Sequence, residues 1–294
     1  MSQPSIPSLR LVLFTSRPPG MVNTLVETFE ALGHQVLLVV TARGTKKYPN
    51  PAYKSIVASS NANLDILVTS HMKRVPAMLR ELAPDLIYSA SFPLRFPPEL
   101  LALPRLGCVN AHPSLLPKYR GLNPLFWQFI HNETHTGLTI HRMDADFDAG
   151  PILVQRELAI APDDDAKSLW GKIARLEVSM LPETLAAVVS GALGRPQSIT
   201  EASYAPLCSA IDRQLDWTRP ATHLHNQIRG LAWLGALALI DGQIMLVRSA
   251  RVVESSHALA SATPGKLLAC SPDGMLIQTG RDALLITEYA GVSQ

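Results

Sequence analysis

Short, continuously apolar runs alternate with amphipathic stretches over the first half of the chain, and this alternation restricts the fold more than any other feature. The runs 10–15 and 35–41 are typical of buried strands, and the stretch 21–32 between them places its apolar residues on one helical face. Further strands are expected at 64–69, 85–89, 107–112, 137–143 and 151–159, and further helices at about 75–82, 122–131 and 165–189. Buried strands that alternate with helices form a parallel sheet covered on both faces, so this part is predicted to be an α/β, Rossmann-like domain.

The end of the chain follows a different pattern. Between 191 and 206 the sequence is rich in Gly, Pro, Ser and Ala and loses its periodicity, which is typical of a linker. A helix at 221–229 is followed by predicted strands at 236–240, 243–250, 266–269, 275–279 and 283–288. The pairs Asp241-Gly242 and Asp273-Gly274 indicate hairpin turns. We therefore expect an α/β domain over 1–190, a linker over 191–206 and a small, open β-barrel (OB-like) domain over 207–294.

Composition excludes several classes of protein. The 294 residues carry a formal charge of only +2, which does not suit a polyanion-coating protein or an acidic tail. The longest strongly apolar stretch, 231–240, has about half the length that a membrane span needs. Three distant cysteines predict neither a disulfide framework nor a zinc site, and Ser16 to Gly20 after the first strand is not a glycine-rich phosphate loop. The chain is expected to be cytoplasmic, without a membrane partner or a bound metal.

Asn110 and His112 lie two residues apart on the predicted strand 107–112, so their side chains point to the same face. The loop after the strand 137–143 carries three acids at alternate positions, Asp144, Asp146 and Asp148. Ligands of α/β sheets bind where the strands end. There Asn110 and His112 can stabilise an oxyanion, and Asp148 can hold His112 charged and accept a proton from an amine. The alternative interpretation of these residues is a strand cap, a core histidine and a solvated turn.

The run His112-Pro-Ser-Leu-Leu-Pro-Lys-Tyr-Arg-Gly121, with Asn110 before it and Asp-x-Asp-x-Asp148-x-Gly-Pro after it, resembles the formyltransferases that use 10-formyltetrahydrofolate. This family includes methionyl-tRNA, glycinamide-ribonucleotide and sugar-nucleotide formyltransferases and the hydrolase domain of formyltetrahydrofolate dehydrogenase. The resemblance implies that 10-formyltetrahydrofolate donates a formyl group to a primary amine, with no metal. It implies that Asn110 and protonated His112 stabilise the oxyanion, and that Asp148 raises the pKa of His112 and assists proton transfer.

The resemblance also implies binding residues. Those expected for the folate are Leu94, Arg95, Phe96, Asp144 and Asp146. Those expected for the acceptor are Lys46, Lys47, Lys118, Tyr119 and Arg120. Here the backbone of 92–97 would line the pteridine pocket and the loop 144–148 would close its other side. The alternative interpretations are a hydrophobic plug over the sheet and solvated surface loops.

The acceptor stays open between methionyl-tRNA and an amino-sugar nucleotide. Asp216-Trp217 and later turns resemble the C-terminal domain of methionyl-tRNA formyltransferase, which sugar-nucleotide enzymes and formylating modules of peptide synthetases share. Seven basic and seven acidic residues cancel over 205–294, which is unfavourable for gripping a tRNA backbone. The loop 43–47 resembles a tRNA-approaching loop, whereas Trp127 resembles the sugar-nucleotide branch. The alternatives are a formyltetrahydrofolate hydrolase, an enzyme for a peptide-synthetase-bound aminoacyl group, or a non-catalytic folate- or RNA-binding protein; the oligomeric state is open.

Overall fold

A computed structural model describes residues 6–44, 52–58, 64–254 and 262–291. Contacts divide the chain into two compact units. Unit 1 comprises residues 1–122, 137–158 and 173–204, and unit 2 comprises 123–136, 159–172 and 205–294. The sequence predicts two consecutive domains joined by a linker at 191–206, whereas these units are interleaved along the chain. Residues 191–204 group with unit 1, and the segments 123–136 and 159–172 group with the C-terminal region.

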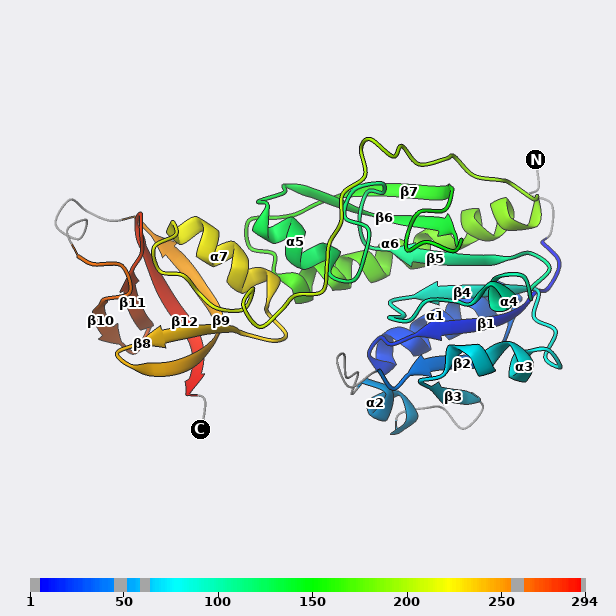
Figure 1. Ribbon diagram of the computed structural model, residues 1–294, viewed down its shortest axis with the longest axis horizontal. Coiled ribbons are helices and arrows are strands. Elements are labelled where there is room, and N and C mark those ends of the chain that lie inside the picture. Colours follow the sequence, from blue (N-terminus) through cyan, green and yellow to red (C-terminus); the bar gives the residue numbers. More distant parts are fainter. Residues whose placement is uncertain (1–5, 45–51, 59–63, 255–261, 292–294) are drawn as a thin grey trace. The chain divides into compact units, whose positions relative to one another are not determined.

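Unit 1 is built on a seven-stranded sheet with the order β3-β2-β1-β4-β5-β6-β7 (Figure 1). The strands are β1 (Arg10–Thr15), β2 (Gln35–Ala42), β3 (Ile66–Thr69), β4 (Leu86–Ala90), β5 (Cys108–His112), β6 (His135–Arg142) and β7 (Ile152–Ala159). The first five strands pair in parallel, and β6 runs antiparallel to β5. The parallel, Rossmann-like arrangement predicted from the sequence is confirmed, and it brings the ends of the parallel strands to one edge of the sheet.

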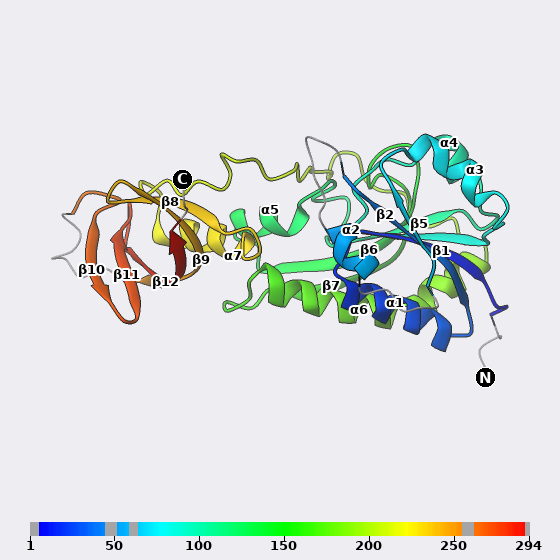
Figure 2. The same ribbon diagram turned by 90° about the horizontal axis from the view of Figure 1, so that it is seen from below.

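Helices cover both faces of this sheet. They are α1 (Pro19–Ala31), α2 (Ala52–Ala58), α3 (Val75–Leu79), α4 (Pro98–Leu101) and α6 (Ala166–Val189), with a 3₁₀ turn η1 (Met72–Arg74). Figure 2 shows α1 and α6 on one face and α3 and α4 on the other. Helix α1 starts with a proline in its first turn and is followed by Gly33 at φ +85°, so its ends follow the sequence signals. The sequence does not predict α2 and α4, which are too short to show a helical period.

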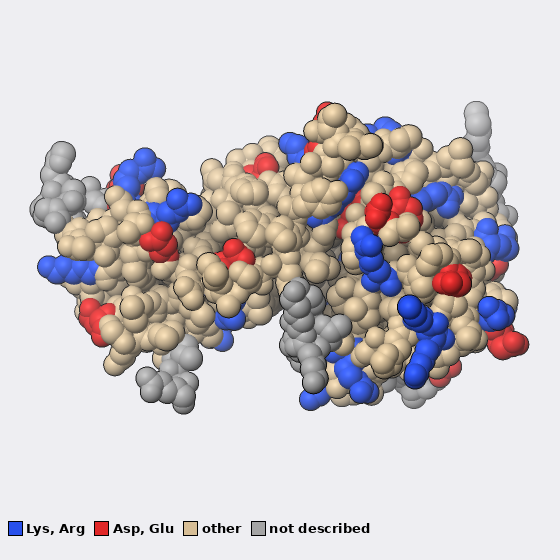
Figure 3. All heavy atoms as spheres, viewed as in Figure 1, with Lys and Arg blue, Asp and Glu red and all other residues tan. Residues whose placement is uncertain are grey.

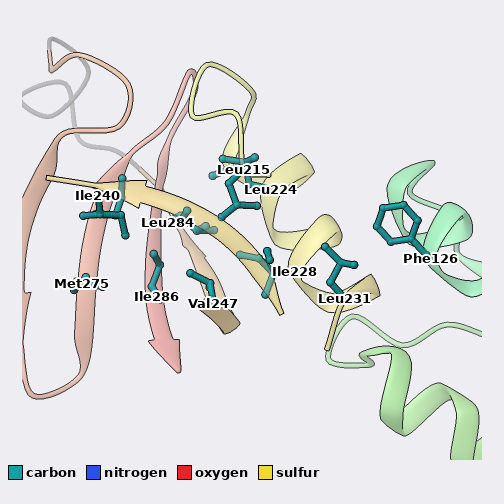
Figure 4. Packing of buried hydrophobic residues seen from close by; sticks show 14 residues of the cluster. Phe126, Leu215, Leu224, Ile228, Leu231, Ile240, Val247, Met275, Leu284 and Ile286 are labelled. Atoms are coloured by element: carbon teal, nitrogen blue, oxygen red, sulfur yellow. The ribbon is translucent and has the colours of Figure 1, made fainter. Parts of the chain in front are cut away.

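Unit 2 contains a five-stranded antiparallel sheet with the order β10-β11-β12-β9-β8. Its elements are α5 (Pro124–Ile130), α7 (Ala221–Gly230), β8 (Ala236–Ile240), β9 (Gln243–Val253), β10 (Leu267–Ser271), β11 (Gly274–Gln278) and β12 (Ala283–Gly291). Leu224 and Ile228 of α7 face Val247 and Leu284 of the sheet in one apolar cluster (Figure 4). The cluster gives this unit a core of its own and agrees with the predicted small, barrel-like β domain.

Among the helices of the described residues, none is long and apolar enough to cross a bilayer.

Candidate active site

Three of the predicted site residues meet at the end of β5. Asn110 and His112 lie on β5, and Asp148 lies in the loop between β6 and β7. The Asn110 Nδ2 atom donates a hydrogen bond to Asp148 Oδ1 at 3.2 Å, and His112 Nδ1 lies 3.5 Å from Asp148 Oδ2. The structure therefore brings together an amide donor, an imidazole and a carboxylate, groups that can stabilise an oxyanion and move a proton in acyl transfer to an amine.

Both ring nitrogens of His112 face oxygen atoms. Its Nε2 lies 2.7 Å from the Tyr119 carbonyl oxygen, and its Nδ1 faces Asp148. Burial lowers the pKa of His112, and it outweighs the opposite effects of Asp148 and the Tyr119 carbonyl. Asp148 raises the pKa of His112 as expected, but the net shift is downward, so the ring is not held protonated by Asp148 as the resemblance implied. A neutral His112 carries its proton on Nε2, toward the carbonyl, and its Nδ1 is ready to accept one beside Asp148.

Asp148 is held as a carboxylate. Burial raises the pKa of Asp148, but His112, His141 and the Gly121 N–H together lower it well below its usual range. The Gly121 N–H donates to Asp148 Oδ2 at 2.8 Å, and Asn110 donates to Oδ1. Only 8% of the Asp148 surface is exposed, and a hydrogen-bond donor contacts each of its two carboxylate oxygens, which compensates the buried charge.

His141 is a site residue that the sequence analysis does not identify. It lies on β6 as the register partner of Asn110, and its Nε2 is 3.2 Å from Asn110 Nδ2 and 3.4 Å from Asp148 Oδ1. Its Nδ1 lies 2.8 Å from the Arg142 carbonyl oxygen, so Nδ1 carries a proton. The sequence signal is a histidine at position 141 of the predicted strand 137–143, but only the antiparallel pairing of β5 and β6 brings it to the site.

The backbone conformation of the turn that carries Asp148 is tightly restricted. Asp148 has φ +54°, in the left-handed region that costs free energy for residues other than glycine. A Cβ atom on Gly150 would lie 1.9 Å from the Arg142 carbonyl oxygen, so only glycine fits there. Gln197 Nε2 donates to the Asp148 and Gly150 carbonyl oxygens at 2.8 and 2.7 Å. Gln197 lies in the predicted linker, and no motif in the sequence singles it out.

The residues expected to bind folate fall into two groups. Phe96 is buried in a core cluster and Leu94 packs against that cluster. Arg95 forms an exposed ion pair with Asp146 at 3.6 Å, and Asp144 Oδ1 accepts from the Asp146 backbone N–H at 3.0 Å. The ion pair brings the two predicted folate segments together, while the Phe96 ring belongs to the core.

The residues expected to bind the acceptor are also divided. Lys46 and Lys47 lie outside the described residues. Lys118 is exposed, but Tyr119 and Arg120 are buried. The Arg120 guanidinium donates to Gln197 Oε1 through Nε at 3.1 Å and Nη2 at 2.7 Å. Arg120 is therefore bonded to Gln197, which in turn donates to the Asp148 carbonyl oxygen, and its burial does not fit the alternative of a solvated surface loop.

Within the described ranges, His, Cys, Asp and Glu side chains form no group of three or more that could hold a metal ion.

Comparisons with known proteins cover nearly the whole chain. Residues 9–185 match the family model for formyl transferase, and residues 208–291 match the model for the formyl transferase C-terminal domain. The methionyl-tRNA formyltransferase of Geobacter sulfurreducens is 37% identical over 290 residues, which cover 94% of this chain and 88% of the relative.

Two solved structures share the fold. HypX from Aquifex aeolicus in complex with tetrahydrofolic acid superposes with a TM-score of 0.73 at 18% identity, over 97% of this chain and 44% of that one. WlaRD, a sugar 3N-formyl transferase solved with dTDP and 5-N-formyl-THF, superposes with a TM-score of 0.65 at 16% identity, over 97% of this chain and 98% of that one.

Proposed function

Since the chain belongs to the formyl transferase family and transfers a formyl group from 10-formyltetrahydrofolate to an amine, we propose that its acceptor is methionyl-tRNA and that Asn110, His112 and Asp148 are its catalytic residues. The meeting of these three side chains at the end of β5 is the observation that carries the catalytic assignment. The acceptor assignment rests on the relative that is 37% identical over 94% of the chain. With this acceptor, the protein works in the cytoplasm.

Each of the three side chains has one task in this reaction. Attack by the amine places negative charge on the formyl oxygen, and the Asn110 amide can donate to it with the N–H that does not serve Asp148. The amine loses a proton as the new C–N bond forms, and His112 Nδ1 accepts it. Asp148, ionised and 3.5 Å away, stabilises the imidazolium that results. The bond between the formyl carbon and the folate nitrogen then breaks, and the His112 imidazolium gives its proton to that nitrogen, so charge and atoms balance.

The donor site is assigned to the two segments joined by Arg95 and Asp146. A pterin ring presents an amino group, ring N–H groups and a carbonyl oxygen, which need hydrogen-bond acceptors and donors at their edge. The loop 144–148 supplies exposed carboxylates, Asp144 and Asp146, and backbone groups of both signs. The chemistry of this loop therefore fits the pterin, and its residues bind and orient the ring while Asp148 serves the reaction.

An amino-sugar nucleotide is the second candidate acceptor, and the charge of the C-terminal region favours it. Basic and acidic side chains number seven each over 205–294, and they are interspersed on the face shown in Figure 3. Exposed basic residues in unit 1, Arg43, Lys54, Lys73 and Arg74, suit the phosphates of either acceptor.

One panel assay separates the candidates. The full-length protein is incubated with 10-formyltetrahydrofolate and either methionyl-tRNA, amino-sugar nucleotides or an aminoacyl group on a peptide-synthetase carrier domain. Formylation of methionyl-tRNA, with an apparent affinity that rises steeply as salt is lowered, supports the proposal. Formylation of a sugar nucleotide alone overturns it in favour of the second candidate. Formate release at full speed without an acceptor identifies a hydrolase.

A further inference from the structure

The two residues that face the ring nitrogens of His112 share an uncommon backbone conformation. Tyr119 has φ +61° and Asp148 has φ +54°, both in the left-handed region. The Tyr119 carbonyl oxygen meets His112 Nε2, and the Asp148 carboxylate lies near His112 Nδ1. The position of the imidazole therefore depends on two strained residues. Such strain persists only where the surrounding structure holds it in place.

The segment 195–204 supplies groups that hold both of them. Gln197 Nε2 donates to the carbonyl oxygens of Asp148 and Gly150 at 2.8 and 2.7 Å. Ser203 Oγ accepts from the Tyr119 N–H at 2.9 Å, and the Ser203 carbonyl oxygen accepts from the Arg120 N–H at 2.9 Å. Residues 195–204 therefore form hydrogen bonds both with the turn at Asp148 and with the turn at Tyr119, and we name them the clamp segment.

Arg120 completes the arrangement by fixing Gln197. Its guanidinium donates twice to Gln197 Oε1, at 3.1 and 2.7 Å, and only 7% of the residue is exposed. Because the amide oxygen is occupied by Arg120, its NH₂ group must point toward the two carbonyl oxygens of the Asp148 turn. A buried arginine bonded to a glutamine amide thus sets the orientation of the group that holds Asp148.

We propose that Gln197, oriented by Arg120, is a positioning residue that fixes the carboxylate of Asp148 against His112. This inference rests on the proposed catalytic role of Asp148. It assigns a role in catalysis to the clamp segment, which leads into the C-terminal part of the chain. Neither Gln197 nor Arg120 exchanges a proton or contacts the reacting atoms.

The test compares Q197M with Q197E and S198A. Methionine keeps the length of glutamine but removes both donors, and glutamate keeps an acceptor for Arg120 while facing two carbonyl oxygens without a donor. Ser198 bonds only to Thr200 among the described contacts on its side chain, so S198A is the matched control. We expect Q197M and Q197E to lower kcat by roughly tenfold or more, from the loss of two hydrogen bonds, with KM for 10-formyltetrahydrofolate changed less than about threefold. S198A is expected to keep wild-type kcat.

Combined variants distinguish positioning from general stability. Q197M in a D148N background should cause almost no further loss, because there is no carboxylate left to position. R120M and Q197M should likewise be non-additive. If D148N itself keeps wild-type turnover, the proposed catalytic role fails. If D148N abolishes turnover but Q197M retains wild-type kcat, the role of Gln197 is overturned.

A measurement without any acceptor completes the test. NMR of the free protein with labelled histidines measures the pKa of each imidazole. The signal of His112 is identified by its absence from the spectrum of H112N. Displacing the Asp148 carboxylate removes an effect that raises the pKa of His112, so Q197M should lower this pKa and S198A should not. Thermal unfolding of each variant shows that it is folded. An unchanged His112 titration in a folded Q197M protein overturns the proposal.

Discussion

Asn110 on β5 and His141 on β6 are register partners, and Asn110 Nδ2 lies 3.2 Å from His141 Nε2. The His141 Nδ1 atom donates to the Arg142 carbonyl oxygen, which fixes the ring so that Nε2 faces both the Asn110 amide and Asp148 Oδ1, the latter at 3.4 Å. The amide that is proposed to stabilise the oxyanion therefore donates to Asp148 and lies against the His141 ring. The pairing of β5 with β6 thus helps to set the direction of the Asn110 amide, the proposed oxyanion donor.

Removing the polar contact of His141 should impair turnover more than folate binding. We expect H141M to lower kcat by roughly tenfold, the cost of one buried hydrogen bond, with little change in KM for the folate. H141Q, which keeps a polar amide near the position of Nε2, should recover part of the loss. Steady-state kinetics of the two variants measures the difference, and equal activity in both would contradict a polar role.

The Asn110 side chain should contribute through the transition state. N110A removes the amide donor, and we expect kcat to fall by roughly two to three orders of magnitude. Binding of 10-formyltetrahydrofolate, followed by isothermal titration calorimetry, should stay within a few fold of wild type. A loss of folate affinity that matched the loss of turnover would assign Asn110 to binding instead.

Turnover should show an acidic limit governed by His112. In the proposed mechanism the neutral ring is the proton acceptor, and burial lowers its pKa, so kcat/KM should hold until the pH falls below the ordinary histidine value of 6.5. D148N removes a charge that raises this pKa, so its residual activity should fall off at still lower pH. A pH–rate profile of both proteins tests the direction, and a limit that moved to higher pH in D148N would contradict it.

Asp148 also makes stability depend on pH. Its folded pKa lies below the unfolded value, so its contribution to stability is present above about pH 3.8 and is lost as the pH falls toward the folded pKa. We expect acid unfolding of D148N, followed by circular dichroism, to be less steep than that of the wild type. A steeper transition in D148N would contradict the assignment.

Alanine substitutions at Gly150 and Gly20 distinguish a steric clash at the site from the general effect of replacing a glycine. In G150A the new Cβ would meet the Arg142 carbonyl oxygen at 1.9 Å, so the Asp148 turn must shift and both stability and kcat should fall. Nothing lies within 4 Å of a Cβ on Gly20 in α1, so G20A should stabilise the protein by about 0.5–1 kcal/mol. Thermal unfolding and kinetics on both variants make the comparison.

A buried ion pair supports unit 1 away from the site. Arg17 and Glu177 are bonded to each other with almost no exposure, and Tyr88 donates to Glu177 Oε1 at 2.8 Å. E177Q leaves the Arg17 charge uncompensated and should cost about 3–5 kcal/mol in unfolding free energy. Y88F removes one hydrogen bond and should cost about 1 kcal/mol. Denaturant unfolding measures both values, and an E177Q protein as stable as wild type would contradict a stabilising role of the ion pair.

Local patterns in the chain predicted much of this protein. Apolar runs and their helical neighbours placed the strands of both sheets close to their observed bounds, because periodicity depends only on which side of the backbone faces the core. The two-residue spacing of Asn110 and His112 placed both on one face of β5 for the same reason. The motif around them was enough to indicate formyl transfer, which the comparisons support over both parts of the chain.

Tertiary structure alone decided what surrounds these residues. His141 reaches Asn110 from 31 positions away because β6 returns antiparallel to β5, and no local pattern specifies the partner of a strand. Gln197 reaches the Asp148 backbone from 49 positions away, out of a segment whose composition indicates only a linker. The pKa of His112 also follows from its burial, which depends on everything packed around it. Side-chain direction is a local property of the backbone, whereas burial and long-range contacts belong to the folded chain as a whole.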